Sequence, residues 1–431
     1  MASSKQRVSY FYDSEFETFY FGQNHPMKPH RLAMTHHLVL GYGLHEKMEV
    51  YKPRRAYPVE LAQYHAADYV EFLSRITPDN AKKYAQQLHM YNINEDCPIF
   101  DGLFKFCQLY TGGTLEGAAK LNHGLSDIAI NWSGGLHHAK KAEASGFCYV
   151  NDLVLAILEL LKYHPRVLYI DIDIHHGDGV EEAFYLSDRV MTVSFHKYGD
   201  FFFPGTGDIV DNGEMNGRFY SINVPLKDGT TDETFHALYQ PIIRKVMEVF
   251  RPGAIVMQCG ADSLAHDRLG CFNMSLKGHG EAIRFMKAYG LPMLVTGGGG
   301  YTKRNVARCW TYETSILTDT PINEALPESD YHEYFAPDFS LNVTAHKVME
   351  DGNSKADVER IRRAVFENLR HLAHAPSVQM HDVPPDAKTE RFDFDEDEPP
   401  LEERMGKYAR DHLIIRENFA DDYQNQMYGY G

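Results

Sequence analysis

One short segment, residues 169–179 (YIDIDIHHGDG), limits more than any other what this chain can fold into. Apolar residues at 167, 168, 170 and 172 predict a buried strand that runs into this segment. Five acidic or imidazole side chains crowd the end of that strand: Asp171, Asp173, His175, His176 and Asp178. Carboxylates this close repel each other unless a cation or an imidazolium ion neutralises them. The segment therefore predicts a metal site at the end of a buried strand rather than a solvated polar loop.

Strand-like apolar runs alternate with helical patterns along most of the chain. The predicted strands are 8–12, 128–132, 167–172, 190–195, 220–224, 254–259 and 292–296. The predicted helices between them include 103–121, 152–163, 232–250, 276–289 and 304–317. Such alternation is typical of βαβ units, so we expect an α/β fold: a single domain with a mostly parallel central sheet and helices on both faces.

The length and the distribution of charge suggest where this domain ends. At 431 residues the chain can bury a large core, and no internal repeat is evident. We expect one compact domain over residues 1–378, with its last helix at 356–373. We expect residues 379–431 to be an acidic, disordered tail, because a stretch such as 393–400 (DFDEDEPP) cannot bury enough apolar surface to fold alone.

Composition argues against several classes of protein. The net charge is −17, and residues 381–431 carry 14 Asp and Glu against 6 Lys and Arg, so we expect no direct sequence-specific binding to nucleic acid. No apolar run approaches the roughly 18 residues that span a bilayer. Six scattered cysteines without a CxxC pair argue against zinc fingers and a disulfide framework. The first residues lack the apolar segment of a secretory signal, so we expect a reducing intracellular environment.

Chemically reactive side chains follow four of the predicted strands. They are His137 and His138 after the strand at 128, the acidic cluster after the strand at 167, Asp262 after the strand at 254, and Tyr301 in a glycine-rich segment after the strand at 292. Ligands of parallel sheets bind beyond the carboxyl ends of the strands. We therefore expect the four segments to form one site.

The types of these residues suggest a catalytic metal. Asp173 and His175 are two residues apart on an extended segment, so their side chains can point the same way, and Asp262 would complete a three-ligand site. Three protein ligands with an open position are typical of a catalytic ion. Two carboxylates and one imidazole suit Zn²⁺ and leave Fe²⁺ and Mn²⁺ open. Such a cation lowers the pKa of bound water from about 15.7 toward 7 and polarises a carbonyl.

The remaining residues can move protons and stabilise charge. His137 and His138 are candidates for proton transfer, with Asp171 and Asp178 as partners for their second ring nitrogens. Tyr301 could donate a hydrogen bond to a developing oxyanion. A metal, a water molecule, two imidazoles and a phenol together predict hydrolysis of an amide.

Seven motifs make the chain resemble the class I histone deacetylases. They are HPMKPHR (25–31), EDCP (95–98), SGGLHHAKKAEASGFCYVND (133–152), YIDIDIHHGDG (169–179), FHKYGDFFFPGTGD (195–208), GADSLAHDRLGCFN (260–273) and GGGGYTKRNVARCWTYET (297–314). Finer details, among them the extra Phe in DFFFPG, are most similar to the type-3 branch. The resemblance implies an arginase/deacetylase-like fold and makes residues 1–378 a zinc-dependent catalytic domain. Its reaction would be hydrolysis of N6-acetyl-lysine in histone tails.

The resemblance also implies a role for each matching residue. It makes Asp173, His175 and Asp262 the ligands of one zinc ion. His137 paired with Asp171 and His138 paired with Asp178 become the catalytic imidazoles, with His138 as general base and acid. Tyr301 would polarise the acetyl carbonyl. Around the substrate, the resemblance implies a tunnel lined by Gly146, Phe147 and Phe203, with Leu269 near its rim, Asp96 at the rim accepting hydrogen bonds from the substrate backbone, and Arg31 in a channel behind the metal.

Further ligands and partners rest on the resemblance alone. It implies an inositol phosphate held by Lys28, Arg268 and Arg304. It also implies structural potassium ions on backbone oxygens, one near Asp171, Asp173, His175, Ser194 and Phe195 and a second near Phe184, Ser187, Val190 and Tyr220. The implied partners are acetylated histone tails and corepressor proteins, in a complex that represses transcription. We expect the nucleus as the location, with the cytoplasm as a second one.

Two other functions are compatible with parts of the pattern. The first is hydrolysis of non-histone or small-molecule amides, as in the arginase-like relatives of this fold, which use a two-metal site. The second is a scaffold that binds acetyl-lysine without cleaving it. The number of metal ions per chain and the activity on an acetyl-lysine peptide distinguish these functions from a histone deacetylase.

Overall fold

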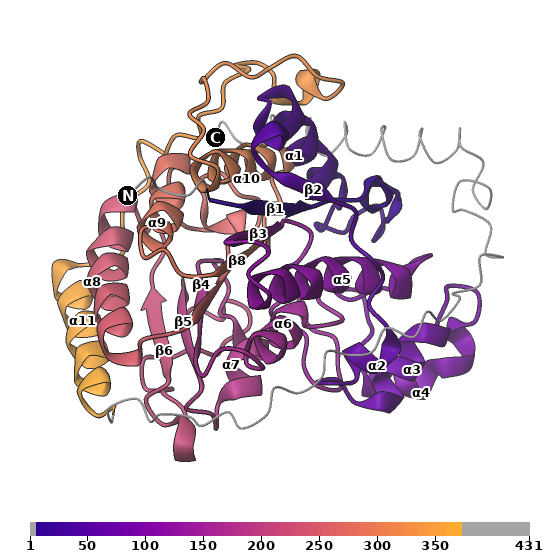
Figure 1. Cartoon of the computed structure of the whole chain (residues 1–431), viewed down its shortest axis with the longest axis horizontal. Helices are drawn as coiled ribbons and strands as arrows, with labels where there is room; N and C mark the ends of the chain where they lie inside the picture. Colours follow the sequence, from indigo (N-terminus) through magenta and orange to yellow (C-terminus); the bar gives the residue numbers. More distant parts are fainter. Residues whose placement is uncertain (1–5, 373–431) are drawn as a thin grey trace.

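The computed structural model describes residues 6–372 and is built around one central sheet of parallel strands (Figure 1). The order across the sheet is β2-β1-β3-β8-β7-β4-β5-β6, and each neighbouring pair is parallel. The strands are β1 (Val8–Phe11), β2 (Glu49–Tyr51), β3 (Ile128–Asn131), β4 (Val167–Asp171), β5 (Val190–Lys197), β6 (Ser221–Leu226), β7 (Ala254–Gln258) and β8 (Met293–Thr296). The expected parallel α/β sheet is confirmed.

Helices cover both faces of this sheet, as expected. One face is covered by α5 (Leu103–Asn122), α6 (Asp152–Leu160) and α7 (Asp178–Phe184). The other face is covered by α1 (His30–Gly41), α8 (Asp232–Phe250), α9 (Leu276–Lys287) and α10 (Lys303–Leu317). Farther from the sheet lie α2 (Pro58–Leu61), α3 (Ala67–Arg75) and α4 (Ala85–Met90), and α11 (Lys355–Arg370) packs against α8 (Figure 1).

Residues of the central strands alternate between the two apolar layers. In β4, Val167 and Tyr169 pack in the layer under α6, whereas Leu168 and Ile170 pack in the opposite layer. Side chains of a strand point alternately to its two faces, and a parallel sheet buried on both faces needs apolar residues on each. This explains why the run before Asp171 is apolar without interruption, and why its charged residues begin where the strand ends.

Several boundaries differ from the expected ones. The edge strand β2 is not among the predicted strands, because it is only three residues long and two of them are exposed. The last described helix, α11, begins at Lys355 and ends at Arg370, close to the expected 356–373. The expected tail, residues 379–431, lies outside the described residues. Across residues 6–372, none of the helices has both the length and the apolarity that crossing a bilayer requires.

Candidate metal centre and active site

The reactive segments follow four neighbouring strands and lie at the same edge of the sheet. In the sheet order, β3, β8, β7 and β4 lie side by side and run in the same direction. His137 and His138 follow β3, Tyr301 follows β8, Asp262 lies on the 3-10 turn Ala261–Ser263 after β7, and Asp173 and His175 follow β4. The carboxyl ends of parallel strands are where such folds bind their ligands. The structure therefore places these residues around a common edge.

Asp173, His175 and Asp262 point toward one another. Nδ1 of His175 lies 3.1 Å from Oδ1 of Asp173 and 3.1 Å from Oδ2 of Asp262. One ligand atom from each residue can be chosen so that all lie within 4.8 Å of one another, and all three residues are buried. Two carboxylates and one imidazole form a donor set that suits Zn²⁺ and leaves positions open for water and substrate. The three residues therefore fit a single metal ion.

The carboxylates of this cluster are stabilised by positive charge beside them. Burial and the charge of Asp173 raise the pKa of Asp262 to about 7. Burial alone would lower the pKa of His175, but hydrogen bonds to Asp173 and Asp262 raise it to about 10. Positive charge on His137 and His175 outweighs burial and holds the pKa of Asp173 well below its usual range. In the metal-free protein, a protonated His175 thus supplies the charge that a divalent ion would supply.

Backbone and amide groups fix the Asp173 carboxylate. Oδ2 of Asp173 accepts hydrogen bonds from Nε2 of Gln258 at 2.8 Å and from the backbone N–H of Gly299 at 2.7 Å. A Cβ atom at Gly260 would lie 1.9 Å from this same oxygen, so only glycine allows the backbone to come this close. Gln258 is a site residue that the sequence alone did not indicate, since it reads as the polar end of an apolar strand.

Two imidazole–carboxylate pairs lie beside the cluster. Nδ1 of His137 is 2.7 Å from Oδ2 of Asp171, and Nδ1 of His138 is 2.7 Å from Oδ1 of Asp178. The two imidazole rings are 3.9 Å apart, centre to centre. Each carboxylate fixes the orientation of its imidazole through Nδ1, and Nε2 of His137 then lies 3.9 Å from Oδ2 of Asp173. These are the pairs expected from the sequence.

The two imidazoles differ in their protonation. Burial would lower the pKa of His137, but the charges of Asp171 and Asp173 raise it to about 9. Burial and the adjacent His137 lower the pKa of His138 to about 3, against the opposing effect of Asp178. Near neutral pH, His137 is therefore protonated and His138 is neutral. His137 can therefore act as a proton donor or as a positive charge, and His138 can act as a base.

Each pair has a further partner that sequence reasoning missed. Nζ of Lys140 forms an ion pair with Oδ2 of Asp178 at 2.7 Å, and the Tyr169 hydroxyl donates a short hydrogen bond to Asp171. Lys140 contributes to a pKa of Asp178 that lies below its usual range, although burial alone would raise it. Nothing in the local pattern distinguishes Lys140 from a surface lysine, because its partner comes from a distant segment.

Tyr301 is held by contacts to its backbone. Oδ2 of Asp267 accepts hydrogen bonds from the backbone N–H groups of Tyr301 at 2.7 Å and Thr302 at 3.1 Å. The guanidinium of Arg31, which is buried, donates to the carbonyls of Gly298 and Gly300 just before Tyr301. Burial, together with Asp262 and Asp173, raises the pKa of the phenol well above its usual value. The phenol therefore stays protonated and can donate a hydrogen bond.

Aromatic rings flank the cluster on its outer side. The ring of Phe147 contacts that of Tyr301 at 5.7 Å, and the ring of Phe203 contacts that of His138 at 5.0 Å, in both cases edge to face. A Cβ atom at Gly146 would lie 2.5 Å from the His138 ring. Phe203 and Leu269 are partly exposed, at 44% and 36%. This placement is compatible with the expected tunnel and rim.

Asp96 and Lys28, two further residues expected from the resemblance, differ in their exposure. Asp96 is exposed, and its backbone carbonyl is 3.0 Å from Nε2 of His25, which in turn contacts the Phe147 ring. Lys28 is buried and donates to the carbonyls of Gly22 and Gln23.

The two expected arginines lie on segments joined by Asp267. Arg268 is exposed and follows Asp267 directly, whereas Arg304 lies in the first turn of α10, which begins just after Thr302. Of the residues expected near potassium, Asp171 and Ser194 are paired across β4 and β5. In the second set, the backbone N–H of Ser187 donates to the Phe184 carbonyl.

Comparison with known proteins agrees with this geometry. A family model described as histone deacetylase domain matches residues 25–317. Histone deacetylase 9 of Arabidopsis thaliana is 62% identical over 98% of this chain and 98% of its own length. Histone deacetylase 1 of Bos taurus is 57% identical over 97% of this chain and 86% of its own. Type-1 histone deacetylase 1 of Dictyostelium discoideum is 55% identical, over 97% and 84%.

Proposed function

Because the chain belongs to the histone deacetylase family, we propose that Asp173, His175 and Asp262 hold the zinc ion on which its reaction depends. Membership of this family makes the chain a hydrolase that removes acetyl groups from histone lysines. The family is zinc-dependent, and the resemblance to class I enzymes is confirmed. The assignment to the type-3 branch stays a prediction. The observation that carries the proposal is the convergence of these three side chains beside two histidine–aspartate pairs.

The protein groups around this centre suggest a division of labour. A zinc ion supplies Lewis acidity, which polarises the acetyl carbonyl and makes water a better nucleophile at neutral pH. His138 is neutral near pH 7 and accepts the proton of the attacking water. His137, protonated at this pH, stabilises the negative charge that develops. Tyr301 donates a hydrogen bond to the carbonyl oxygen as that oxygen becomes negative. The proton that His138 accepted from water then passes to the lysine nitrogen as the bond between this nitrogen and the acetyl carbon breaks.

The surrounding rings suggest how the substrate is oriented. We propose that Phe147 and Phe203 enclose the methylene chain of acetyl-lysine, with Gly146 leaving room beside His138. Two aromatic faces desolvate an unbranched chain and exclude branched side chains. Leu269 would contact the residues next to the lysine. Asp96, exposed at the rim, would accept hydrogen bonds from the substrate backbone.

The larger assembly is a further proposal. We propose that the catalytic domain spans residues 1–378, that it acts in the nucleus, and that it joins a corepressor complex. Lys28, Arg268 and Arg304 would bind an inositol phosphate, since three cations from separate segments suit a polyanion. Backbone oxygens near Asp171 and Ser194, and near Phe184 and Ser187, would bind potassium.

A deacetylation assay tests this function. The full chain is incubated with an acetyl-lysine histone peptide, with and without inositol phosphate and a corepressor domain. We expect released acetate in each case and a higher rate when both additions are present. Lack of acetate release under all conditions would contradict the proposal. A preference for small amides, with two transition-metal ions per chain, would favour the arginase-like alternative.

A further inference from the structure

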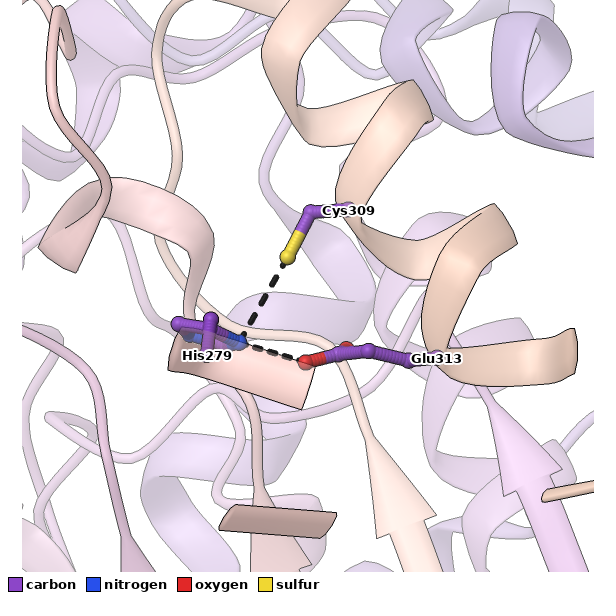
Figure 2. Close-up of side chains that lie close together, drawn as sticks. All are labelled: His279, Cys309 and Glu313. Atoms are coloured by element: carbon purple, nitrogen blue, oxygen red, sulfur yellow. Dashed lines mark hydrogen bonds and ion pairs between the residues drawn. The ribbon is translucent and has the colours of Figure 1, made fainter. Parts of the chain in front are cut away.

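A second buried group of titratable side chains contacts the segment that carries the proposed zinc ligand Asp262. It consists of His279 on α9 and of Cys309 and Glu313 on α10 (Figure 2). All three residues are 0% exposed. Cys309 and Glu313 are four residues apart, so they lie one turn apart on the same face of α10. His279 reaches this face from the neighbouring helix. The reaction proposed above does not use any of these residues.

The imidazole of His279 links α10 to the segment that carries Asp262. Its Nδ1 is hydrogen-bonded to Oε1 of Glu313, and its Nε2 donates to the backbone carbonyl of Gly260 at 3.0 Å. Burial alone would lower the pKa of this imidazole, but the Glu313 carboxylate raises it. The bond to Glu313 fixes the ring so that Nε2–H points at Gly260.

Gly260 is where the chain turns from the sheet toward the metal centre. β7 ends at Gln258, and the turn Ala261–Ser263 with Asp262 begins immediately after Gly260. The carbonyls of Cys259 and Gly260 are both capped by side chains from the helices, the first by Trp310 Nε1 at 2.9 Å and the second by His279. A buried carbonyl needs such a partner, so these donors determine how the backbone enters the turn. Asp262 is two residues farther along.

Residue types alone would also allow a second metal ion in this group. Two hydrogen bonds that use both ring nitrogens of His279 favour a role without a metal. Nδ1 of His279 and Oε1 of Glu313 are bonded to each other, and Nε2 is bonded to Gly260. The group therefore acts as a hydrogen-bonded link.

We propose that His279, oriented by Glu313, is a positioning residue for the zinc ligand Asp262 and slows the release of the ion. The inference rests on the zinc centre proposed above. Partners in the second coordination shell hold a ligand in the geometry that the metal requires, and their loss typically weakens metal binding about 10- to 100-fold. Here the link runs through a backbone carbonyl rather than through the carboxylate itself.

Zinc release from the full-length protein tests this role. The variants are His279→Phe, which removes both ring nitrogens, Glu313→Leu, which leaves the ring without its partner, and Glu313→Gln, which can still hydrogen-bond Nδ1. Cys309→Ala is the matched control, because it removes the 3.5 Å contact between the thiol and Nδ1 of His279 but leaves the bonds of His279 to Glu313 and Gly260 in place. The rate at which a chelator removes zinc is measured well below each variant's unfolding temperature.

We expect His279→Phe and Glu313→Leu to release zinc about 10-fold faster or more, and Glu313→Gln and Cys309→Ala to stay close to the wild type. All four variants can lower the unfolding temperature, so a change in thermal stability does not distinguish a positioning role from a purely structural one. If His279→Phe does not fold, the zinc release rates of Glu313→Leu and Glu313→Gln are compared to test the inference.

Equal release rates in all folded variants would overturn the inference. So would a Cys309→Ala variant that loses zinc as fast as Glu313→Leu, or a second zinc ion that disappears with Cys309. Failure of the proposed zinc centre gives a different result, since then Asp173→Asn would keep as much zinc as the wild type.

Discussion

Asp267 accepts a 2.7 Å hydrogen bond from the backbone N–H of Tyr301, 34 residues farther along the chain. Its other carboxylate oxygen accepts from the N–H groups of Leu269 and Gly270, at 2.9 and 3.2 Å. One carboxylate thus joins the loop after Asp262 to the glycine-rich segment that ends in the proposed catalytic phenol. Such a cross-link fixes the backbone from which the phenol projects.

Replacing Asp267 with Asn should lower kcat. An amide offers N–H where two backbone N–H groups need an acceptor, so the Tyr301 segment would shift. A misplacement of about 1 Å can cost about 100-fold in rate, and we expect a loss of about 10- to 100-fold with zinc retained. Asp351→Asn is the control, because Asp351 also accepts backbone N–H groups, from Thr231 and Asn353, in a distant loop. Equal kcat in both variants would contradict this role.

Gly146→Ala should block the site while leaving the metal in place. The new Cβ would lie 2.5 Å from the His138 ring and 2.9 Å from the Phe203 ring, and the residue has a φ of +49°. We expect kcat/KM to fall about 100-fold with unchanged zinc content. Gly124→Ala is the matched control, because Gly124 has a φ of +60° with nothing within 4 Å of its Cβ. A fully active Gly146→Ala enzyme would exclude the proposed approach of the substrate.

Asp171→Asn should shift the alkaline side of the pH–rate profile. Asp171 is the foremost of the neighbouring charges that raise the pKa of His137 to about 9 against the effect of burial. Loss of this negative charge lowers the pKa, so His137 loses its proton at a lower pH and activity declines at a lower pH than in the wild type. The measurement is kcat against pH for both proteins. An unchanged or higher alkaline limit would show that His137 does not act as a cation.

Zinc binding should release protons at pH 7. In the metal-free protein the pKa of His175 is about 10 and that of Asp262 about 7, so the imidazole is protonated at this pH. A metal ligand must be deprotonated, so uptake displaces that proton and the apparent zinc affinity rises with pH up to about 10. Calorimetry of zinc uptake in two buffers with different ionisation enthalpies counts the protons. Binding without proton release would place the ion elsewhere.

The sequence predicted the part of the site that follows strands. Apolar runs mark β3, β4, β7 and β8, and the polar residues directly after them are the ones that the sheet brings together. The sequence did not indicate that β7 and β8 lie between β3 and β4, because strand order depends on how the helices cross the sheet. The resemblance to a known family supplied the substrate and the division of roles.

The missed residues act through partners that are distant in sequence. Gln258 ends an apolar strand, Asp267 lies in a polar loop, and His279 and Glu313 lie on the buried faces of helices. Each is a polar residue in a segment without a recognisable site pattern. Its role follows only from the long-range hydrogen bond that it makes in the folded chain. Binding through backbone oxygens, as proposed for potassium, leaves no side-chain pattern at all.

The most direct test of the account is the zinc content of purified variants, measured together with their deacetylation of an acetyl-lysine peptide. The account predicts one zinc ion per wild-type chain, loss of both zinc and activity in Asp173→Asn and Asp262→Asn, and retention of zinc with a loss of about 100-fold or more in kcat in Tyr301→Phe. An Asp262→Asn protein that keeps its zinc and its activity would contradict the central claim.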